Sequence, residues 1–172
     1  MRTGYVQVYT GNGKGKTTAA FGLALRAAGA GLRVFIAQFI EGMPYSELKA
    51  FERFKDLITI QQYGTDCFIF KNPTPEDCEA ARRGLNEITP IVTGGNHDIV
   101  ILDEINIATH YELLPVPDVL KLIKDRAPGT ELILTGRYAD EQILECADLV
   151  TEMLERKHYY QHGIQARTGI EK

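Results

Sequence analysis

The chain has 172 residues, a formal net charge of −4, and 44% hydrophobic residues. These values are typical of a single α/β domain covering residues 1–172, with enough length to bury a substantial core. The mild negative charge and the lack of a long basic run disfavour a nucleic-acid partner, and no apolar run approaches the roughly 18 residues of a membrane-spanning helix.

The first 28 residues predict a strand, a glycine-rich turn and a helix. Residues 5–9 carry β-branched and aromatic side chains, whereas residues 19–28 are mostly good helix formers. This is the context of a phosphate-binding loop, because glycines let successive N–H groups point at an anion and the helix N-terminus adds partial positive charge. The predicted nucleotide contacts are Gly11, Asn12, Gly13, Lys14, Gly15, Lys16, Thr17 and Thr18.

Two side chains of this loop carry specific chemistry. Lys16 supplies a full positive charge, and Thr17 supplies a hydroxyl placed to hold Mg²⁺. The general pattern G-x-x-x-x-G-K-[ST] has glycine where this chain has Thr10, and we expect the glycines that follow to supply the missing freedom. The alternative is a glycine-rich hairpin with two solvated lysines, which the flanking strand and helix disfavour.

The remaining chain alternates between predicted strands and predicted helices. Strands are expected over residues 33–40, 57–63, 98–104 and 131–135. Helices are expected over residues 45–54, 74–92, 116–127 and 140–147. The second of these helices is expected to stop at Gly94-Gly95, with an earlier end or kink at Pro90 as the alternative. Residues 149–160 are expected to form one or two strands, or a strand with an extended tail. The alternation predicts an α/β fold with a mainly parallel sheet flanked by helices, resembling P-loop NTPases of the RecA-like type.

Polar residues follow two of the predicted buried strands. Asp103 and Glu104 end a run of four apolar residues, at the strand end where α/β proteins build ligand sites. They are suited to hold Mg²⁺ directly or through water, although one could instead activate water as a general base, or both could be solvated loop acids. Arg137 follows the strand 131–135, where it either clamps phosphate oxygens or is an ordinary surface arginine.

Other reactive residues give weaker signals. His158 and His162 are four positions apart, but the surrounding sequence does not predict a helix, which disfavours a metal site. No Ser/His/Asp or Cys/His arrangement supports covalent catalysis. The three cysteines are widely spaced and odd in number, which argues against a disulfide framework and favours a reducing cytoplasm. The first β-run begins almost at once, so no signal peptide is expected.

Several stretches together resemble a known family, the P-loop ATP:corrinoid adenosyltransferases, also called cob(I)alamin or cob(I)yrinic acid a,c-diamide adenosyltransferases. The matching stretches are residues 9–29, 38–40, 102–106, 134–137 and 163–171. They span almost the whole chain, and Thr10 matches this family's own version of the phosphate-binding loop.

The resemblance implies adenosyl transfer, in which Co(I) of a reduced corrinoid attacks C5′ of ATP and triphosphate leaves. Lys16 and Arg137 would be catalytic by stabilising the leaving triphosphate. Thr17, Asp103 and Glu104 would hold Mg²⁺, or Mn²⁺ in its place. Because Co(I) is itself the nucleophile, the protein needs no activated serine, cysteine or base, and it contributes positioning and charge stabilisation.

The resemblance also implies contacts to the corrinoid from Phe68, Phe70 and Arg167. Members of the family tend to have a Phe-x-Trp pair in this region, and Phe68-Ile69-Phe70 stands in for it in a chain without tryptophan. Core packing is the alternative role of the two phenylalanines. Glu41 stands where members often have lysine. The implied partners are an electron-donating reductase such as a flavoprotein and, as an assembly, a homodimer.

Two other functions remain open from the sequence. The chain could be another P-loop kinase or ATPase, in which Asp103 or Glu104 activates water or a hydroxyl. It could also be a binding module without catalysis, in which ATP only switches a surface. The products separate the three, because the transferase releases triphosphate, the kinase or ATPase releases ADP, and the module turns nothing over.

Overall fold

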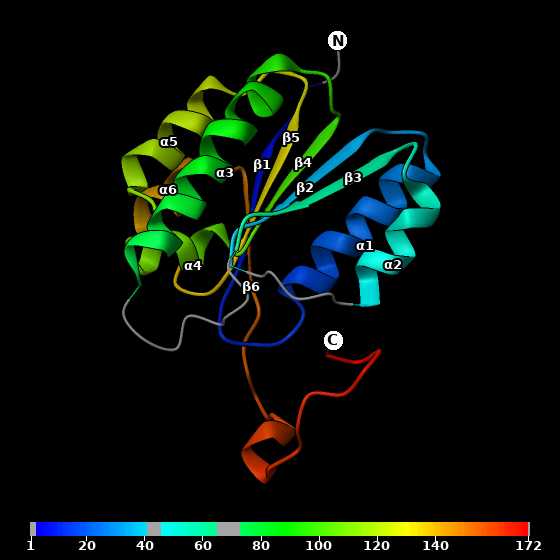
Figure 1. Cartoon of the computed structure of the whole chain (residues 1–172), viewed down its shortest axis with the longest axis vertical. Coiled ribbons are helices and arrows are strands. Elements are labelled where there is room, and N and C mark those ends of the chain that lie inside the picture. The colour runs from blue at the N-terminus through cyan, green and yellow to red at the C-terminus, as the bar shows by residue number, and fades with distance from the viewer. Residues whose placement is uncertain (1–2, 41–45, 65–72, 172) are drawn as a thin grey trace.

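The computed structural model describes residues 3–40, 46–64 and 73–171. A six-stranded parallel sheet with strand order β3-β2-β4-β5-β1-β6 runs through its centre (Figure 1). The strands are β1 (Val6–Thr10), β2 (Val34–Gln38), β3 (Ile58–Gln62), β4 (Ile99–Asp103), β5 (Glu131–Thr135) and β6 (Leu149–Glu152). The α/β fold with a parallel sheet is therefore as predicted, and all C-terminal strand ends meet at one edge.

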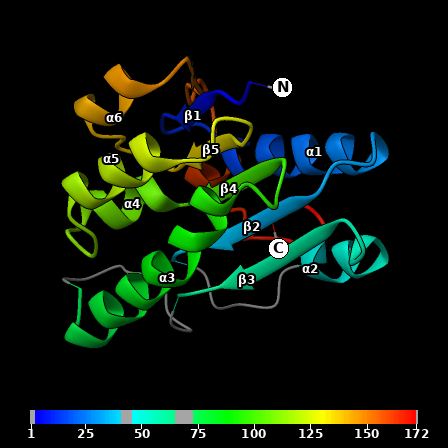
Figure 2. The same ribbon diagram turned by 90° about the horizontal axis from the view of Figure 1, so that it is seen from above.

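Helices cover both faces of this sheet (Figure 2). One face is covered by α1 and α2, and the other by α3, α4, α5 and α6. The helices are α1 (Lys16–Gly29), α2 (Ser46–Phe51), α3 (Pro75–Gly94), α4 (Ile105–His110), α5 (Val116–Asp125) and α6 (Glu141–Cys146), with short 3₁₀ turns η1 (Glu52–Phe54) and η2 (Tyr159–His162). No helix in the described ranges is both long enough and apolar enough to cross a lipid bilayer.

The central strands β2, β4 and β5 are buried on both sides because each side meets a layer of helices. In β4, Ile99 and Ile101 pack in the cluster that contains the α1 alanines, whereas Val100 and Leu102 pack in the cluster that contains Ile88 of α3. Successive side chains of a strand point to opposite faces. Both clusters hold the central strands firmly, so the loops at their C-terminal ends start from fixed positions.

One long helix agrees with the expectations and one short helix was not predicted. The helix α3 continues through Pro90 to Gly94 and ends at Gly95, whose φ is 68°, so its stop at these two glycines is as predicted. Its start agrees with the prediction, since Thr74 and Asp77 form a reciprocal capping box. The helix α4 has only six residues and was not predicted, because so short a segment shows little periodicity.

The end of the chain forms one strand and an extended tail, one of the alternatives left open for residues 149–160. The four residues of β6 are exposed and form the edge of the sheet beside β1. After β6 the chain leaves the sheet, passes through η2 and turns back toward the edge that carries the loop after β1 (Figure 1). This return brings residues from opposite ends of the sequence together.

Two glycines within helices, Gly84 and Gly22, differ in how closely neighbouring residues pack against them. A Cβ atom at Gly84 in α3 would lie 2.6 Å from Cγ of Tyr63, whereas one at Gly22 in α1 would meet nothing within 4 Å. We expect Gly84→Ala to lower the free energy of unfolding, because overpacking costs about 1–3 kcal/mol, which exceeds the helix-propensity gain of about 1 kcal/mol. Gly22→Ala receives only that gain and should be stabilising. Urea unfolding measures both, and a stabilised Gly84→Ala variant would contradict this packing.

Candidate active site

The turn between β1 and α1 wraps around the ammonium group of Lys16. This side chain is only 6% exposed, and its Nζ donates hydrogen bonds of 2.8 Å to the carbonyl oxygens of Gly11 and Gly13. Burial lowers the pKa of Lys16, and the carboxylates of Glu104 and Asp103 oppose that shift. A cation is thus held in the centre of the glycine-rich loop, at the N-terminus of a 14-residue helix, which is the arrangement that binds phosphate.

The glycines of the loop serve two purposes. Gly15 directly precedes α1 with a φ of 119°, a conformation that other residues rarely adopt. A Cβ atom at Gly11 or Gly13 would instead lie 2.5 Å or 2.7 Å from the carbonyl oxygen of Met153. The amide of Gly13 donates a 2.6 Å hydrogen bond to that same oxygen. Conformational freedom was predicted from the sequence, but the close approach of Met153 was not.

The carboxylate of Asp103 connects this loop to the sheet. Asp103 is completely buried, and its Oδ1 accepts hydrogen bonds from Thr17 Oγ1 at 3.0 Å and from Thr135 Oγ1 at 2.6 Å. Its Oδ2 accepts one from Gln38 Nε2 at 3.2 Å. Burial raises the pKa of Asp103, while these three hydrogen bonds favour the charged form. The predicted partners Thr17 and Asp103 are therefore in direct contact.

Two residues of this cluster were missed in the sequence. Gln38 is the last residue of β2, and Thr135 is the last residue of β5. Both are buried polar side chains. A polar residue at the C-terminal end of an otherwise apolar buried strand was the available signal, and it was used for Asp103 but not for these two.

Glu104 lies beside this cluster in a strained conformation. Its φ is 59°, in the left-handed region, which is uncommon for a residue other than glycine and occurs often at functional sites. Its amide donates to Thr135 Oγ1 at 3.0 Å, which orients the turn into α4. Burial, and then the nearby Asp103, raise the pKa of Glu104 to about 7, against the effect of two nearby cations. A further cation beside Glu104, such as a metal ion, would favour the ionised form of its carboxyl group.

A cavity of about 630 Å³ opens above the phosphate loop. Besides residues 13–18, the side chains and backbone that line it include Phe21, Ser46, Glu47, Glu104, Arg137, His158, Gly169, Ile170 and Glu171. Arg137 is exposed and also lines an adjoining cavity of about 650 Å³ with Asn12. The predicted Lys16, Thr17, Glu104 and Arg137 thus lie around one space, which is large enough for a nucleotide.

The oxygen atoms of Thr17 and Glu104, which line this cavity, and of Asp103, which is buried against Thr17, are suited to Mg²⁺. Thr17 contributes a hydroxyl, while Asp103 and Glu104 contribute carboxylates, and Mg²⁺ is usually held by one or two carboxylates together with substrate phosphates and water. Within the described residues, no group of three or more His, Cys, Asp and Glu side chains could hold a metal by itself. The donor set therefore fits a metal that arrives with phosphate oxygens.

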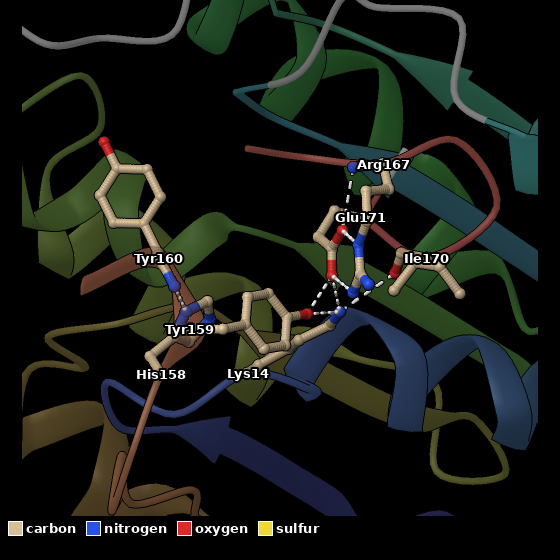
Figure 3. A network of polar contacts seen from close by, with 7 residues as sticks. All are labelled: Lys14, His158, Tyr159, Tyr160, Arg167, Ile170 and Glu171. Carbon is tan, nitrogen blue, oxygen red and sulfur yellow. Dashed lines mark hydrogen bonds and ion pairs between the residues drawn. The ribbon is translucent and has the colours of Figure 1, made fainter. Parts of the chain in front are cut away.

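Two further predicted residues, Lys14 in the lining of this cavity and Arg167 outside it, meet at Glu171. Lys14 and Arg167 both contact Glu171, with Nζ to Oε1 at 2.6 Å and Nε to Oε2 at 3.2 Å (Figure 3). Glu171 was not predicted as a site residue, although it belongs to the stretch that carried the family resemblance. Phe68, Phe70 and Glu41 lie outside the described residues, so the roles expected for them stay predictions.

The position of Lys16 predicts a loss of nucleotide binding on its removal. We expect Lys16→Ala to weaken MgATP binding by about 1.5–3 kcal/mol, the usual contribution of a charge-assisted hydrogen bond, or roughly ten- to hundredfold in Kd. Isothermal titration calorimetry measures this directly. Lys121→Ala, which removes an exposed lysine of α5, is the matched control and should bind normally. Unchanged affinity in Lys16→Ala would contradict the phosphate-loop assignment.

Comparisons with known proteins agree with this geometry. A model of the family described as ATP:corrinoid adenosyltransferase BtuR/CobO/CobP matches residues 2–171. The chain is 36% identical to a corrinoid adenosyltransferase of Sinorhizobium sp. over 98% of its own length and 80% of the relative's. It is also 36% identical to the corrinoid adenosyltransferase of Escherichia coli K12, over 98% and 85% of the two chains. It is 35% identical to the corrinoid adenosyltransferase CobA of Salmonella typhimurium, again over 98% of this chain and 85% of the relative. The chain belongs to the ATP:corrinoid adenosyltransferase family.

Proposed function

We propose that the cavity above the phosphate loop is where this chain transfers the 5′-deoxyadenosyl group of ATP to Co(I) of a reduced corrinoid, in cobalamin biosynthesis or salvage. The observation that carries this assignment is the contact between the loop and the acid of β4, in which Thr17 Oγ1 lies 3.0 Å from Asp103 Oδ1. This contact holds the loop that would bind phosphate against the end of β4, whose acid would bind the metal.

The reaction suits the residues in the cavity. The electron pair of Co(I) forms the cobalt–carbon bond to C5′, the bond from C5′ to the triphosphate oxygen breaks, and triphosphate leaves with the electron pair of that broken carbon–oxygen bond. Because the substrate supplies the nucleophile, the protein has two tasks, to position both substrates and to neutralise the leaving group. Positioning alone contributes about 7–11 kcal/mol. Lys16 and Arg137, which line the cavity, are the proposed cations that stabilise the departing triphosphate.

Thr17, Asp103 and Glu104 are the residues that would hold Mg²⁺, or Mn²⁺, beside the triphosphate. The metal would supply further positive charge to the leaving group. The raised pKa of Glu104 supports this role, because a nearby cation favours its charged form. Thr17 and Asp103 already form a hydrogen bond to each other, so both oxygens face one small volume at the start of α1.

Further partners follow from the chemistry of cobalt. Making Co(I) requires an electron donor, and we propose a reductase such as a flavoprotein for this step.

A homodimer is the proposed assembly, supported by Leu149 and Val150, which leave 44% and 46% of their surface exposed on the edge strand β6. The free thiols of Cys78 and Cys146 support a reducing cytoplasm as the compartment. Neither nucleic acid nor a membrane is proposed as a partner.

Product analysis tests this function against its rivals. The purified protein is incubated with MgATP, with and without chemically reduced corrinoid, and the phosphate products are separated. Triphosphate and adenosylated corrinoid should appear together and only when both substrates are present. Glu104, with a pKa near 7, could act as a general base in a hydrolase or kinase. Release of ADP would therefore favour that rival, and no turnover would favour a nucleotide-gated binding module.

The acidic pair predicts a specific dependence on metal. Asp103→Asn and Glu104→Gln should each raise the Mg²⁺ concentration needed for half-maximal activity by roughly tenfold or more, as changes around a metal commonly do. The rate of triphosphate release across a Mg²⁺ titration provides the measurement. Asp125→Asn, at an exposed acid of α5, serves as the control with an unchanged titration. If both site variants kept full activity at low Mg²⁺, the acids would be structural and the metal assignment wrong.

Phe68 and Phe70 are the proposed residues against the lower face of the corrinoid, and Arg167 is a further proposed contact. Aromatic side chains there would exclude water and displace the lower axial ligand of Co(II) without offering a donor. A one-electron reduction becomes tenfold more favourable for each change of about 59 mV in potential.

The double variant Phe68→Ala/Phe70→Ala separates this role from packing. It should bind MgATP normally and fail with Co(II) corrinoid and a mild reductant, because the axial ligand stays on. Much of its rate should return when Co(I) is generated chemically beforehand. Equally low activity with preformed Co(I), or a lost melting transition, would show that the two phenylalanines serve another purpose.

A further inference from the structure

The last residues of the chain form a strap along the phosphate loop. We define the C-terminal strap as residues 154–171, most of which are exposed. The hydrogen bonds and the ion pair that join the strap to the phosphate loop all end on one atom, Nζ of Lys14. Its acceptors are the hydroxyl of Tyr159 at 3.1 Å, the carbonyl of Ile170 at 3.1 Å and Oε1 of Glu171 at 2.6 Å. The strap is therefore fastened to the nucleotide-binding loop itself.

Glu171 is the centre of this attachment (Figure 3). Its Oε1 accepts from Lys14, from the hydroxyl of Tyr159 and from Nη2 of Arg167, while its Oε2 accepts from the amide and Nε of Arg167. The Arg167 guanidinium also lies 4.9 Å from the centre of the Tyr159 ring. These donors hold the pKa of Glu171 far below its usual range. A single exposed ion pair contributes little, but several charges in one network contribute more.

The network forms part of the wall of the nucleotide cavity. Gly169, Ile170 and Glu171 line the same 630 Å³ cavity as phosphate-loop residues 13–18. Two cations, Lys14 and Arg167, surround the carboxylate of Glu171, so the network carries a net positive charge. The attachment of the strap therefore borders the space that a triphosphate would occupy.

We propose that Glu171 is a positioning residue of the ATP site, which fixes Lys14 of the phosphate loop and closes the C-terminal strap along the nucleotide cavity. A free lysine side chain loses rotamer freedom when it binds a ligand. Because Glu171 has already ordered Lys14, less of that freedom remains to be lost when the triphosphate arrives. The proposal rests on the proposed function only in that the cavity holds ATP.

The test compares Glu171→Gln, Glu171→Asp and the control Asp125→Asn, which removes the acid of an exposed ion pair on α5 remote from the cavity. Amide hydrogen exchange of residues 154–171 is measured without nucleotide, and Kd for MgATP is measured by calorimetry without corrinoid. The kcat is then measured with preformed Co(I) corrinoid and saturating ATP. Melting curves establish that each variant is folded.

Glu171→Gln should speed exchange throughout the strap and raise Kd for MgATP about tenfold, as expected for the loss of charge-assisted hydrogen bonds. Its kcat at saturating ATP should change less than about threefold, because the removed interaction serves binding in general. Glu171→Asp keeps the negative charge, so its exchange rate in the strap and its Kd for MgATP should lie between those of Glu171→Gln and the wild type. Asp125→Asn should match the wild type throughout.

Four outcomes would overturn the proposal. Unchanged exchange in Glu171→Gln would show that Glu171 does not hold the strap. Faster exchange with an unchanged Kd would show that the strap does not position Lys14 for ATP. A lower Kd in Glu171→Gln, or faster exchange of the wild-type strap on adding MgATP, would show that the contact opposes binding. If the wild type binds MgATP but releases no triphosphate, the proposed function fails and the test of Glu171 remains valid.

Discussion

The buried carboxylate of Asp103 is the interaction on which the rest of the site depends. A charge without access to water is costly unless hydrogen bonds compensate it, and here the donors come from three different elements. Thr17 lies at the start of α1, Gln38 at the end of β2 and Thr135 at the end of β5. Because one carboxylate needs all three, the phosphate loop and the central strands are held in one arrangement, which is the geometry that a metal-bound triphosphate requires.

Three cationic side chains in the lining of the cavity are placed in three different ways. The loop carbonyls hold Lys16 in a buried position, Glu171 holds Lys14 at the rim, and the guanidinium of Arg137 is exposed beside the cavity. Positive charge that is already oriented needs little reorganisation when a leaving group develops negative charge. This distribution fits the proposed mechanism, in which the substrate supplies the nucleophile and the protein contributes positioning and electrostatics.

The sequence predicted best those features that follow from local pattern. Continuous apolar runs identified the buried strands, and the acids after β4 were placed correctly at the edge of the sheet. The prediction was weakest for short segments whose backbone conformation depends on contacts with neighbouring elements. The helix α4 starts from Glu104, whose φ is left-handed and whose amide donates a hydrogen bond to Thr135 Oγ1. This start cannot be derived from periodicity alone.

The sequence by itself determined the parallel α/β fold, the phosphate loop, the acidic pair and the family, because these depend on residue types at fixed local spacing. Only the tertiary structure decided which distant residues complete the site. Met153 contacts Gly11 and Gly13, and Glu171 contacts Lys14, across more than 130 positions of sequence. The physical reason is that the path of the chain after β6 depends on edge pairing with β1 and on a few polar contacts of the tail, which leave no periodic signal in the sequence.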